Sequence, residues 1–543
     1  MKKLLIILLA FAAIQLNAQD VEHYKKVVKE LSSSKYQGRG YAKDGANKAG
    51  KYLQKEFTKL GADTVILQPF TLSINTFPGK MMFSVDGKKQ IPGVDFTMRE
   101  FSPGVSGTFP LYYIDTLNYN SEKIFNDLNL PEYQNAFVVC DFMFSYKHRA
   151  DFARLQKKGG APNAGLLYKW EEPLKFYKAY GERVVDKPII WVPYRFPDDA
   201  KTVTADIENK FLKDYECFNV IAKVEGANHD SCYVFTAHYD HLGNLGRKVY
   251  YAGANDNASG TATIVTLAAY YAKNKPKYDM YFIAFSGEDA NLRGSEWYAN
   301  HPVVPLSQIK YLINIDMIGD NNPVQYCEVS DEGMRGFALF EEINSQNHFA
   351  EKLHRAPLAG NSDHYPFAQR HVPCIFLMNE DGDAFKYYHT IHDTWKNAVL
   401  FGYEPVFKLV TSFIERYSCK EDQKVAFTQL NNYFFKNNQE IPTNTKITTA
   451  EEFSQLFGMA TVMGKEGKPT PVDFEKEFVI AVVLPVTDFL TELVPFSLNK
   501  SDKGLIFTYQ KRIGDKQTWS MQPILLIKVS REYERENVEL VAQ

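Results

Sequence analysis

Acidic and imidazole side chains recur in the middle of this chain, most of them just after a short apolar run or in a Gly/Asn-rich turn, and His389 in the stretch Tyr-His-Thr-Ile-His-Asp-Thr (388–394). They are His238, Asp240, Asp256, Glu288, Asp289, Asp316 and His389. The apolar runs read as strands, and the turn that contains Asp256 leads into an expected helix. If the strands are parallel, their carboxyl ends meet at one edge of the sheet, and these groups converge there.

Taken singly, each residue has an ordinary interpretation. An Asp before a helix is most often an N-cap, and an acid at a strand end is commonly just solvated. Several carboxylates that converge repel one another, however, and need cations to coexist. Three acids and two imidazoles suit two divalent ions. Two zinc ions, three carboxylates and one shared hydroxide balance in charge, which predicts a hydrolytic site with a hydroxide nucleophile.

Five motifs in this order carry a family resemblance. They are Thr-Ala-His-Tyr-Asp-His-Leu-Gly (236–243), Gly-Ala-Asn-Asp-Asn-Ala-Ser-Gly (253–260), Ser-Gly-Glu-Asp-Ala-Asn-Leu-Arg-Gly-Ser (286–295), Asn-Ile-Asp-Met-Ile-Gly (314–319) and Tyr-His-Thr-Ile-His-Asp-Thr (388–394). The chain resembles the zinc aminopeptidases of family M28 (clan MH), the bacterial leucyl-type enzymes and their relatives, over about residues 20–60 and 216–420.

The resemblance implies a role for each residue. Asp256 would bridge two zinc ions. One ion would also be held by His238 and Asp316, the other by Asp289 and His389. A hydroxide between the ions would attack the peptide carbonyl of a peptide substrate.

The same resemblance assigns the residues around the ligands. Glu288 would be the general base, and Asp240 would accept the other ring N–H of His238. Tyr388 is a candidate donor to the oxyanion, with simple packing as the alternative. Asp363 and Asp393 would lie behind the ligands, with a structural hydrogen-bonding role expected for Asp363.

One pair departs from the family pattern. The family usually has two glutamates where this chain has Glu288 and Asp289. Because Asp is shorter by one methylene, we expect a weaker second zinc site. His241 and His392 stand beside motif residues, and no role is assigned to either.

The elements that position these residues alternate between strand and helix. Strands are expected at 219–224, 232–237, 279–285, 311–315 and 373–378, and helices at 259–273, 333–345 and 403–417. This pattern predicts an α/β fold with a mostly parallel mixed sheet flanked by helices. A β-rich insertion that resembles a protease-associated domain and a small C-terminal α+β domain would complete it.

The expected organisation has five parts. They are a signal peptide (1–18), the N-terminal part of the peptidase domain (19–75), the inserted domain (76–215), the zinc peptidase domain (216–420) and a C-terminal domain of unknown role (425–543). Lys2 and Lys3 precede an apolar run too short to span a bilayer. The protein is therefore expected to be exported, periplasmic or secreted, with a mature chain that begins near Gln19.

Composition excludes several function classes. The net charge of −3 and the absence of basic runs argue against nucleic-acid binding, and no later segment is apolar enough for a membrane span. Six scattered cysteines without a CxxC pair argue against a thiolate metal site, and buried free thiols and disulfides both stay open. Nothing in the sequence indicates an oligomeric state.

Alternative functions share this scaffold. A glutaminyl cyclase would use a single zinc ion, but the motifs at 257–260 and 292–295 match the peptidases. A receptor-like binding protein would be expected to have lost ligands, and none is missing. A glutamate-type carboxypeptidase would use the same metals and stays open.

Overall fold

The computed structural model describes residues 21–542 except for 177–180, 381, 383–384, 399, 423, 438, 443–444, 461–467 and 502–503. The expected signal peptide at 1–18 lies outside the described residues. The chain divides into two compact units, Met1–Phe413 and Ile414–Gln543, and helix α10 (Tyr403–Asp422) runs through the boundary.

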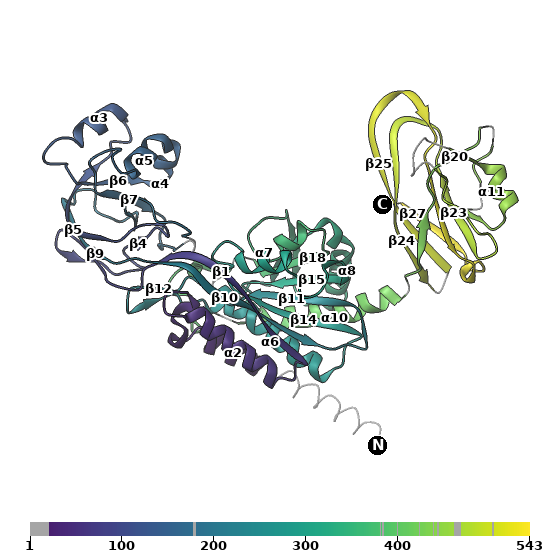
Figure 1. Cartoon of the computed structure of the whole chain (residues 1–543), viewed down its shortest axis with the longest axis horizontal. Coiled ribbons are helices and arrows are strands. Elements are labelled where there is room, and N and C mark those ends of the chain that lie inside the picture. Colours follow the sequence, from purple (N-terminus) through teal and green to yellow (C-terminus); the bar gives the residue numbers. More distant parts are fainter. Residues whose placement is uncertain are drawn as a thin grey trace, which may run out of the picture. The chain divides into compact units, whose positions relative to one another are not determined.

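The first unit contains an eight-stranded sheet in the order β1-β10-β14-β11-β15-β18-β16-β17 (Figure 1). The bounds are β1 (Thr64–Thr76), β10 (Lys210–Val224), β11 (Asn228–His238), β14 (Tyr278–Phe285), β15 (Ile309–Ile315), β16 (Val324–Val329), β17 (Lys352–Ala356) and β18 (Cys374–Asn379). The central strands β14, β11, β15 and β18 are parallel, while β1, β10 and β16 join by antiparallel pairs.

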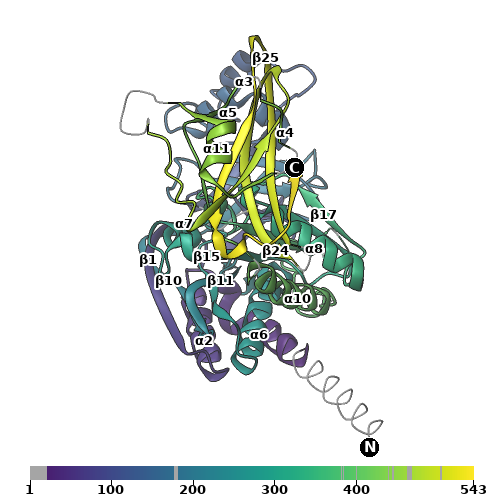
Figure 2. The ribbon, with the colours of Figure 1, turned by 90° about the vertical axis from the view of Figure 1, so that its right-hand side faces the viewer.

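Alternate residues of the central strands face opposite layers of helices. Phe235 and Phe282 stack on each other at 5.0 Å and face α6 (Gly260–Lys273), where Tyr271 stacks on Phe235. Val234 and Ile283 belong to a core on the other face that includes α7 (Arg293–Asn300) and α9 (Tyr365–Ala368). Helices α2 (Gly45–Lys59) and α6 lie side by side in both views (Figures 1 and 2). The predicted α/β class with a mostly parallel mixed sheet is confirmed.

The insertion leaves the main sheet through β1 and returns through β10, which pair over most of their length. Between them lies a second sheet in the order β3-β2-β9-β5-β6-β7-β8-β4. Its strands are β2 (Met81–Val85), β3 (Lys88–Lys89), β4 (Thr97–Met98), β5 (Val105–Tyr113), β6 (Phe137–Asp141), β7 (Gly165–Trp170), β8 (Ile189–Pro193) and β9 (Thr202–Ile207). Helices α3 (Ser121–Asp127), α4 (Phe142–Lys147) and α5 (Arg149–Gln156) accompany it.

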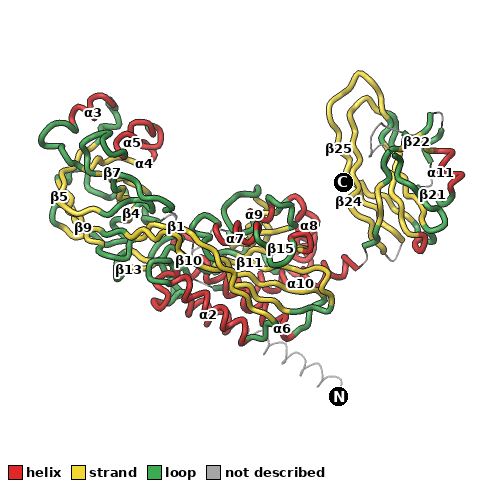
Figure 3. The backbone as a smooth tube through the Cα atoms, in the orientation of Figure 1, coloured by secondary structure: helices red, strands yellow, loops and turns green. Residues whose placement is uncertain are grey.

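The described part of the second unit is built mainly from strands and includes the short helix α11 (Ala450–Leu456), drawn in red in Figure 3. A four-stranded sheet contains β19 (Phe427–Gln429), β26 (Ile524–Ser530), β23 (Glu477–Val483) and β21 (Lys446–Ile447). A three-stranded sheet contains β24 (Thr487–Ser501), β25 (Gly504–Met521) and β27 (Val538–Ala542), and β20 (Tyr433–Phe435) pairs with β22 (Phe457–Met459).

The structure bears on the state of the cysteines and on the possibility of a membrane-spanning helix. The cysteines whose side chains are described are all free and buried: Cys140, Cys217, Cys232, Cys327 and Cys374. Within the described part of the chain, no helix is long and apolar enough to cross a membrane.

Candidate metal centre

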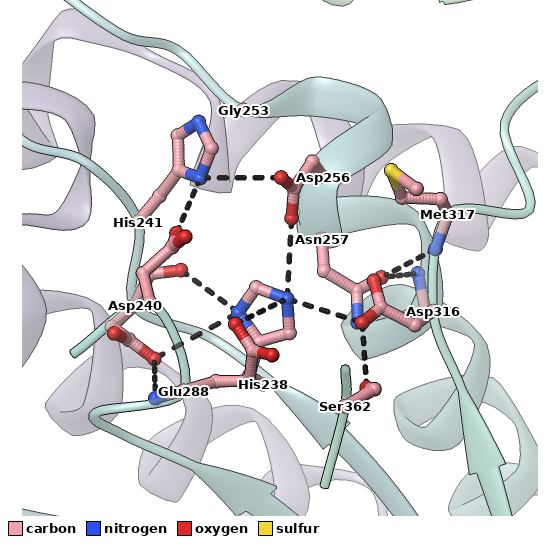
Figure 4. A network of polar contacts seen from close by, with 12 residues as sticks. His238, Asp240, His241, Gly253, Asp256, Asn257, Glu288, Asp316, Met317 and Ser362 are labelled. Carbon is pink, nitrogen blue, oxygen red and sulfur yellow. Dashed lines mark hydrogen bonds and ion pairs between the residues drawn. The ribbon is translucent and has the colours of Figure 1, made fainter. Parts of the chain in front are cut away.

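The carboxyl ends of the parallel strands bring the first group of candidate ligands together. Strand β11 ends at His238, and Asp316 directly follows β15. Nε2 of His238 lies 3.2 Å from Oδ1 of Asp256 and 3.4 Å from Oδ2 of Asp316 (Figure 4). All three side chains are buried, so two carboxylates and an imidazole meet away from the protein surface.

A second group meets on the other side of Asp256. Nε2 of His389 lies 3.0 Å from Oδ2 of Asp256 and 3.5 Å from Oδ1 of Asp289. Asp256 therefore presents one oxygen to His238 and the other to His389. This is the arrangement that a carboxylate shared by two cations requires.

The spacing of these atoms fits zinc. Two ligand atoms on one tetrahedral zinc ion lie about 3.3 Å apart. The contacts of His238 with Asp256 and Asp316, at 3.2 and 3.4 Å, match this value, and those of His389, at 3.0 and 3.5 Å, bracket it. Nitrogen and carboxylate oxygen donors are also the ligands that zinc accepts. The residues present therefore suit two ions.

The pKa shifts of Asp256 and His238 also indicate a site that favours bound cations. Burial alone would raise the pKa of Asp256, but the imidazoles of His241, His238 and His389 hold it well below its usual value. Burial would lower the pKa of His238, yet the carboxylates of Asp316 and Glu288 raise it well above its usual value. Positive charge is therefore strongly favoured here, and bound cations would supply it.

Glu288 lies beside both groups without being part of the closest contacts. Its Oε2 is 3.8 Å from Nε2 of His238. Burial raises the pKa of Glu288 well above its ordinary value, and the neighbouring carboxylate of Asp289 adds to this effect. A carboxyl group with a raised pKa next to a hydrolytic site suits a general base that accepts a proton and later releases it.

The loop that carries Asp256 is fixed by hydrogen bonds to its backbone. Asp393 accepts from the backbone N–H groups of Asn255 and Asp256 at 2.8 and 3.0 Å. The side chain of Asn257 donates to the carbonyl of Ile315 at 3.0 Å. These contacts keep the loop that carries Asp256 next to the carboxyl end of β15, which Asp316 follows.

Asp240 lies next to His238, but its contacts differ from those that the family resemblance implies. Nδ1 of His238 lies 3.3 Å from the backbone oxygen of Asp240, whereas the carboxylate is 3.8 Å away. That carboxylate accepts from the hydroxyl of Tyr41 at 2.7 Å and from the backbone N–H of Glu288 at 3.2 Å. Asp240 therefore links His238, Glu288 and the N-terminal segment.

Asp316 is oriented by a buried chain of polar groups. Ser362 donates to Oδ2 of Asp316 at 2.8 Å, Asn314 donates to Ser362 at 2.8 Å, and Thr236 donates to Asn314 at 2.7 Å. Asp363 follows Ser362 and is fully buried, but neither of its oxygens has a hydrogen-bond partner among the described residues. Burial raises the pKa of Asp363 to about 7.

Tyr388 lies against a ligand. Its ring stacks on His389 at 3.8 Å between centroids and on Phe385 at 5.3 Å. Burial raises the pKa of its hydroxyl well above the ordinary value, so the group stays a protonated donor. The stacking gives Tyr388 a packing role and leaves its hydroxyl able to donate.

Two further side chains contact the site, and the sequence alone assigns a role to neither of them. Arg39 is fully buried and donates to backbone carbonyls around the site, including that of Asp256 at 3.0 Å. His241 is fully buried with Nδ1 2.9 Å from Oδ2 of Asp289. His241 stands inside the first motif, which was a visible cue. No sequence feature connects Arg39 with this site.

Known proteins share both the sequence pattern and the fold. The family described as "Peptidase family M28" matches residues 219–414. A "Probable zinc metalloprotease" of Pyrenophora tritici-repentis is 32% identical over 27% of this chain and 30% of its own length. An aminopeptidase of Bacillus subtilis is 27% identical over 45% of this chain and 56% of its own length. The matched part of the chain thus covers 30% to 56% of the length of these relatives.

Solved structures show the same fold. A zinc aminopeptidase from Bacillus subtilis superposes with a TM-score of 0.56 at 17% identity, over 73% of this chain and 95% of its own. An aminopeptidase from Aneurinibacillus sp. strain AM-1 gives a TM-score of 0.53 at 20% identity, over 73% of this chain and 93% of its own. The match to peptidase family M28 spans residues 219–414, which contain every candidate metal ligand.

Proposed function

We propose that this protein is an exported, zinc-dependent exopeptidase that removes N-terminal residues from peptides. The observation that carries the proposal is the shared position of Asp256, whose two oxygens face His238 on one side and His389 on the other. Asp316 and Asp289 complete the two groups. Such a constellation is suited to two zinc ions.

When bound, zinc would polarise the scissile carbonyl and lower the pKa of water so that a nucleophile exists at neutral pH. The chain's own residues then manage the protons. Glu288 would take a proton from the attacking water and deliver it to the leaving amine, because its carboxylate lies beside the candidate ligands, with Oε2 3.8 Å from Nε2 of His238. The protonated hydroxyl of Tyr388 would donate to the oxyanion.

Aminopeptidase activity is favoured over the other activities of this scaffold. The similar proteins with printed activities are mainly aminopeptidases. Both metal groups are complete here, whereas a glutaminyl cyclase would need a single zinc ion. A glutamate-type carboxypeptidase is the second candidate, and the substrate assay below separates it from the first.

A substrate panel tests the proposal. The mature protein is incubated with aminoacyl anilides, a capped C-terminal dipeptide and a peptide that begins with Gln. Release of arylamine supports the aminopeptidase. Cleavage of only the capped dipeptide would indicate the carboxypeptidase, and loss of ammonia from the Gln peptide would indicate the cyclase.

Export is tested separately. The charged start at Lys2 and Lys3 followed by a short apolar run supports cleavage near Ala18. Expression in a bacterium with an intact secretion pathway, followed by N-terminal sequencing, should give a chain that begins near Gln19. A chain in the cytoplasm that retains Met1 would refute export.

A further inference from the structure

His241 lies at the second group of ligands, although neither the sequence motifs nor the proposed reaction gives it a role. Its side chain is fully buried. Nδ1 is 2.9 Å from Oδ2 of Asp289 and 3.8 Å from Oδ2 of Asp256. Its other ring nitrogen, Nε2, is buried with no hydrogen-bond partner among the described residues. Nδ1 of the ring therefore faces two carboxylates of the metal centre.

The two oxygens of Asp289 face different imidazoles. Oδ1 lies 3.5 Å from Nε2 of His389, the spacing expected for two ligands of one ion. Oδ2 lies 2.9 Å from Nδ1 of His241, which is the length of a hydrogen bond. Nδ1 of His241 also lies 3.8 Å from Oδ2 of Asp256, farther than the separation of about 3.3 Å between two ligands of one zinc ion, so His241 fits a hydrogen-bond donor better than a third ligand.

The imidazole is held in this orientation by its surroundings. Gly253 lies close to the ring, and a Cβ atom added there would lie 2.5 Å from Cδ2 of His241. The carboxylate of Asp289 facing Nδ1 selects the tautomer that carries the proton on Nδ1. Figure 4 shows the ring of His241 facing the carboxylate of Asp256, which lies 3.8 Å from Nδ1.

We propose that His241 is a positioning residue that donates Nδ1–H to Oδ2 of Asp289 and so presents Oδ1 alone to the second zinc ion. This inference rests on the proposed zinc peptidase function. A short Asp side chain reaches the ion only in a narrow range of orientations, so a donor that fixes its rotation strengthens the site. Outer hydrogen bonds of this kind typically contribute about 10- to 100-fold to metal affinity.

Three variants separate this role from the alternatives. In His241→Asn the amide Nδ2–H can occupy the place of Nδ1–H, because both atoms are bonded to Cγ. In His241→Gln the donor is moved outward by one methylene. In His241→Leu the volume is roughly kept and the donor is lost. The readout is the affinity of the metal-free protein for its second equivalent of zinc, measured by competition with a chromophoric chelator, with thermal melting of the metal-free proteins as a folding check.

We expect the Asn variant to keep the affinity of the parent protein for the second zinc. The Leu and Gln variants should lose about 10- to 100-fold, and the first equivalent should be unchanged in all three. If Leu binds as the parent does, the ring only packs. If the Asn variant loses as much affinity for the second zinc as the Leu variant, the imidazole ring itself is required, either as a ligand or to fill the buried space. Either result overturns the proposal. If the Leu variant does not fold, the difference in second-zinc affinity between the Asn and Gln variants tests the proposal instead.

Failure of the proposed function would look different. A parent protein that neither binds two zinc ions nor cleaves any peptide of the panel would refute the peptidase assignment itself. A parent that binds two ions and cleaves, with all three variants equal to it in second-zinc affinity, would refute only the role of His241.

Discussion

Arg39 offers a sharp test of how the N-terminal segment supports the site. Its guanidinium is fully buried and donates to five backbone carbonyls, listed here with their distances: Tyr239 at 2.7 Å, Leu31 at 3.2 Å, Ala252 at 2.6 Å, Gly253 at 2.8 Å and Asp256 at 3.0 Å. Four of these carbonyls belong to the segments that carry His238 and Asp256, and that of Leu31 belongs to the N-terminal segment. The conservative perturbation is Arg39→Lys.

The expected loss of folding stability follows from the number of N–H donors on each side chain. A lysine ammonium has three N–H donors, so at least two of the five carbonyls lose their partner. Each buried acceptor left without a partner costs about 1–3 kcal/mol. The free energy of unfolding of Arg39→Lys should therefore fall by about 2–6 kcal/mol, a large part of the about 5–15 kcal/mol typical of a folded domain.

The assay is urea denaturation of the metal-free protein followed by circular dichroism. Arg183→Lys is the matched control, because Arg183 is exposed and its replacement should change stability by less than about 0.5 kcal/mol. If Arg39→Lys unfolds within about 1 kcal/mol of the parent, the buried guanidinium does not hold these loops, and the reasoning fails.

The remaining predictions concern the base, a buried acid and the metals. Glu288→Gln should keep zinc content but lower kcat by about 10²- to 10⁴-fold in the anilide assay; full activity would exclude it as the base. Glu328 accepts hydrogen bonds from Ala359, Asn361 and His364, and these hold its pKa below 4.5 against the opposing effect of burial. Its contribution to stability is therefore present above pH 4.5 and lost as pH falls through the lowered pKa, so Glu328→Gln should be less stable than the parent at pH 7 and approach it in melts at lower pH. An equal difference at all pH values would contradict this. Chelation should destabilise the protein by about 2.7 kcal/mol relative to zinc at 100 times its dissociation constant; an unchanged melting temperature would argue against zinc binding.

Much of the main sheet was predictable because its strands are short apolar runs separated by clear turn residues. Strands β11, β14, β15 and β18 overlap the predicted ranges, and the helix after Asp256 is α6. The parallel arrangement then places the residues that follow each strand at one edge. Strands β16 and β17 were missed, because their mixed polar sequences lack the regular alternation that marks a strand.

Contacts between distant segments were not predictable. Tyr41 donates to Asp240 across 199 positions, and Arg39 reaches Asp256 across 217. Local periodicity says which face of a helix is buried but does not say which distant backbone a polar side chain meets. His241 was visible beside a motif residue, yet its contact with Asp289 depends on how two strand ends are spaced. The sequence could identify the groups, and tertiary packing decides how they touch.

Anomalous diffraction at the zinc edge from crystals of the zinc-loaded protein tests the central claim most directly. Two peaks are predicted, one between His238, Asp256 and Asp316, and the other between His389, Asp256 and Asp289, with Asp256 contacting both. A single peak that does not touch Asp256, or zinc bound only elsewhere on the chain, would contradict the account.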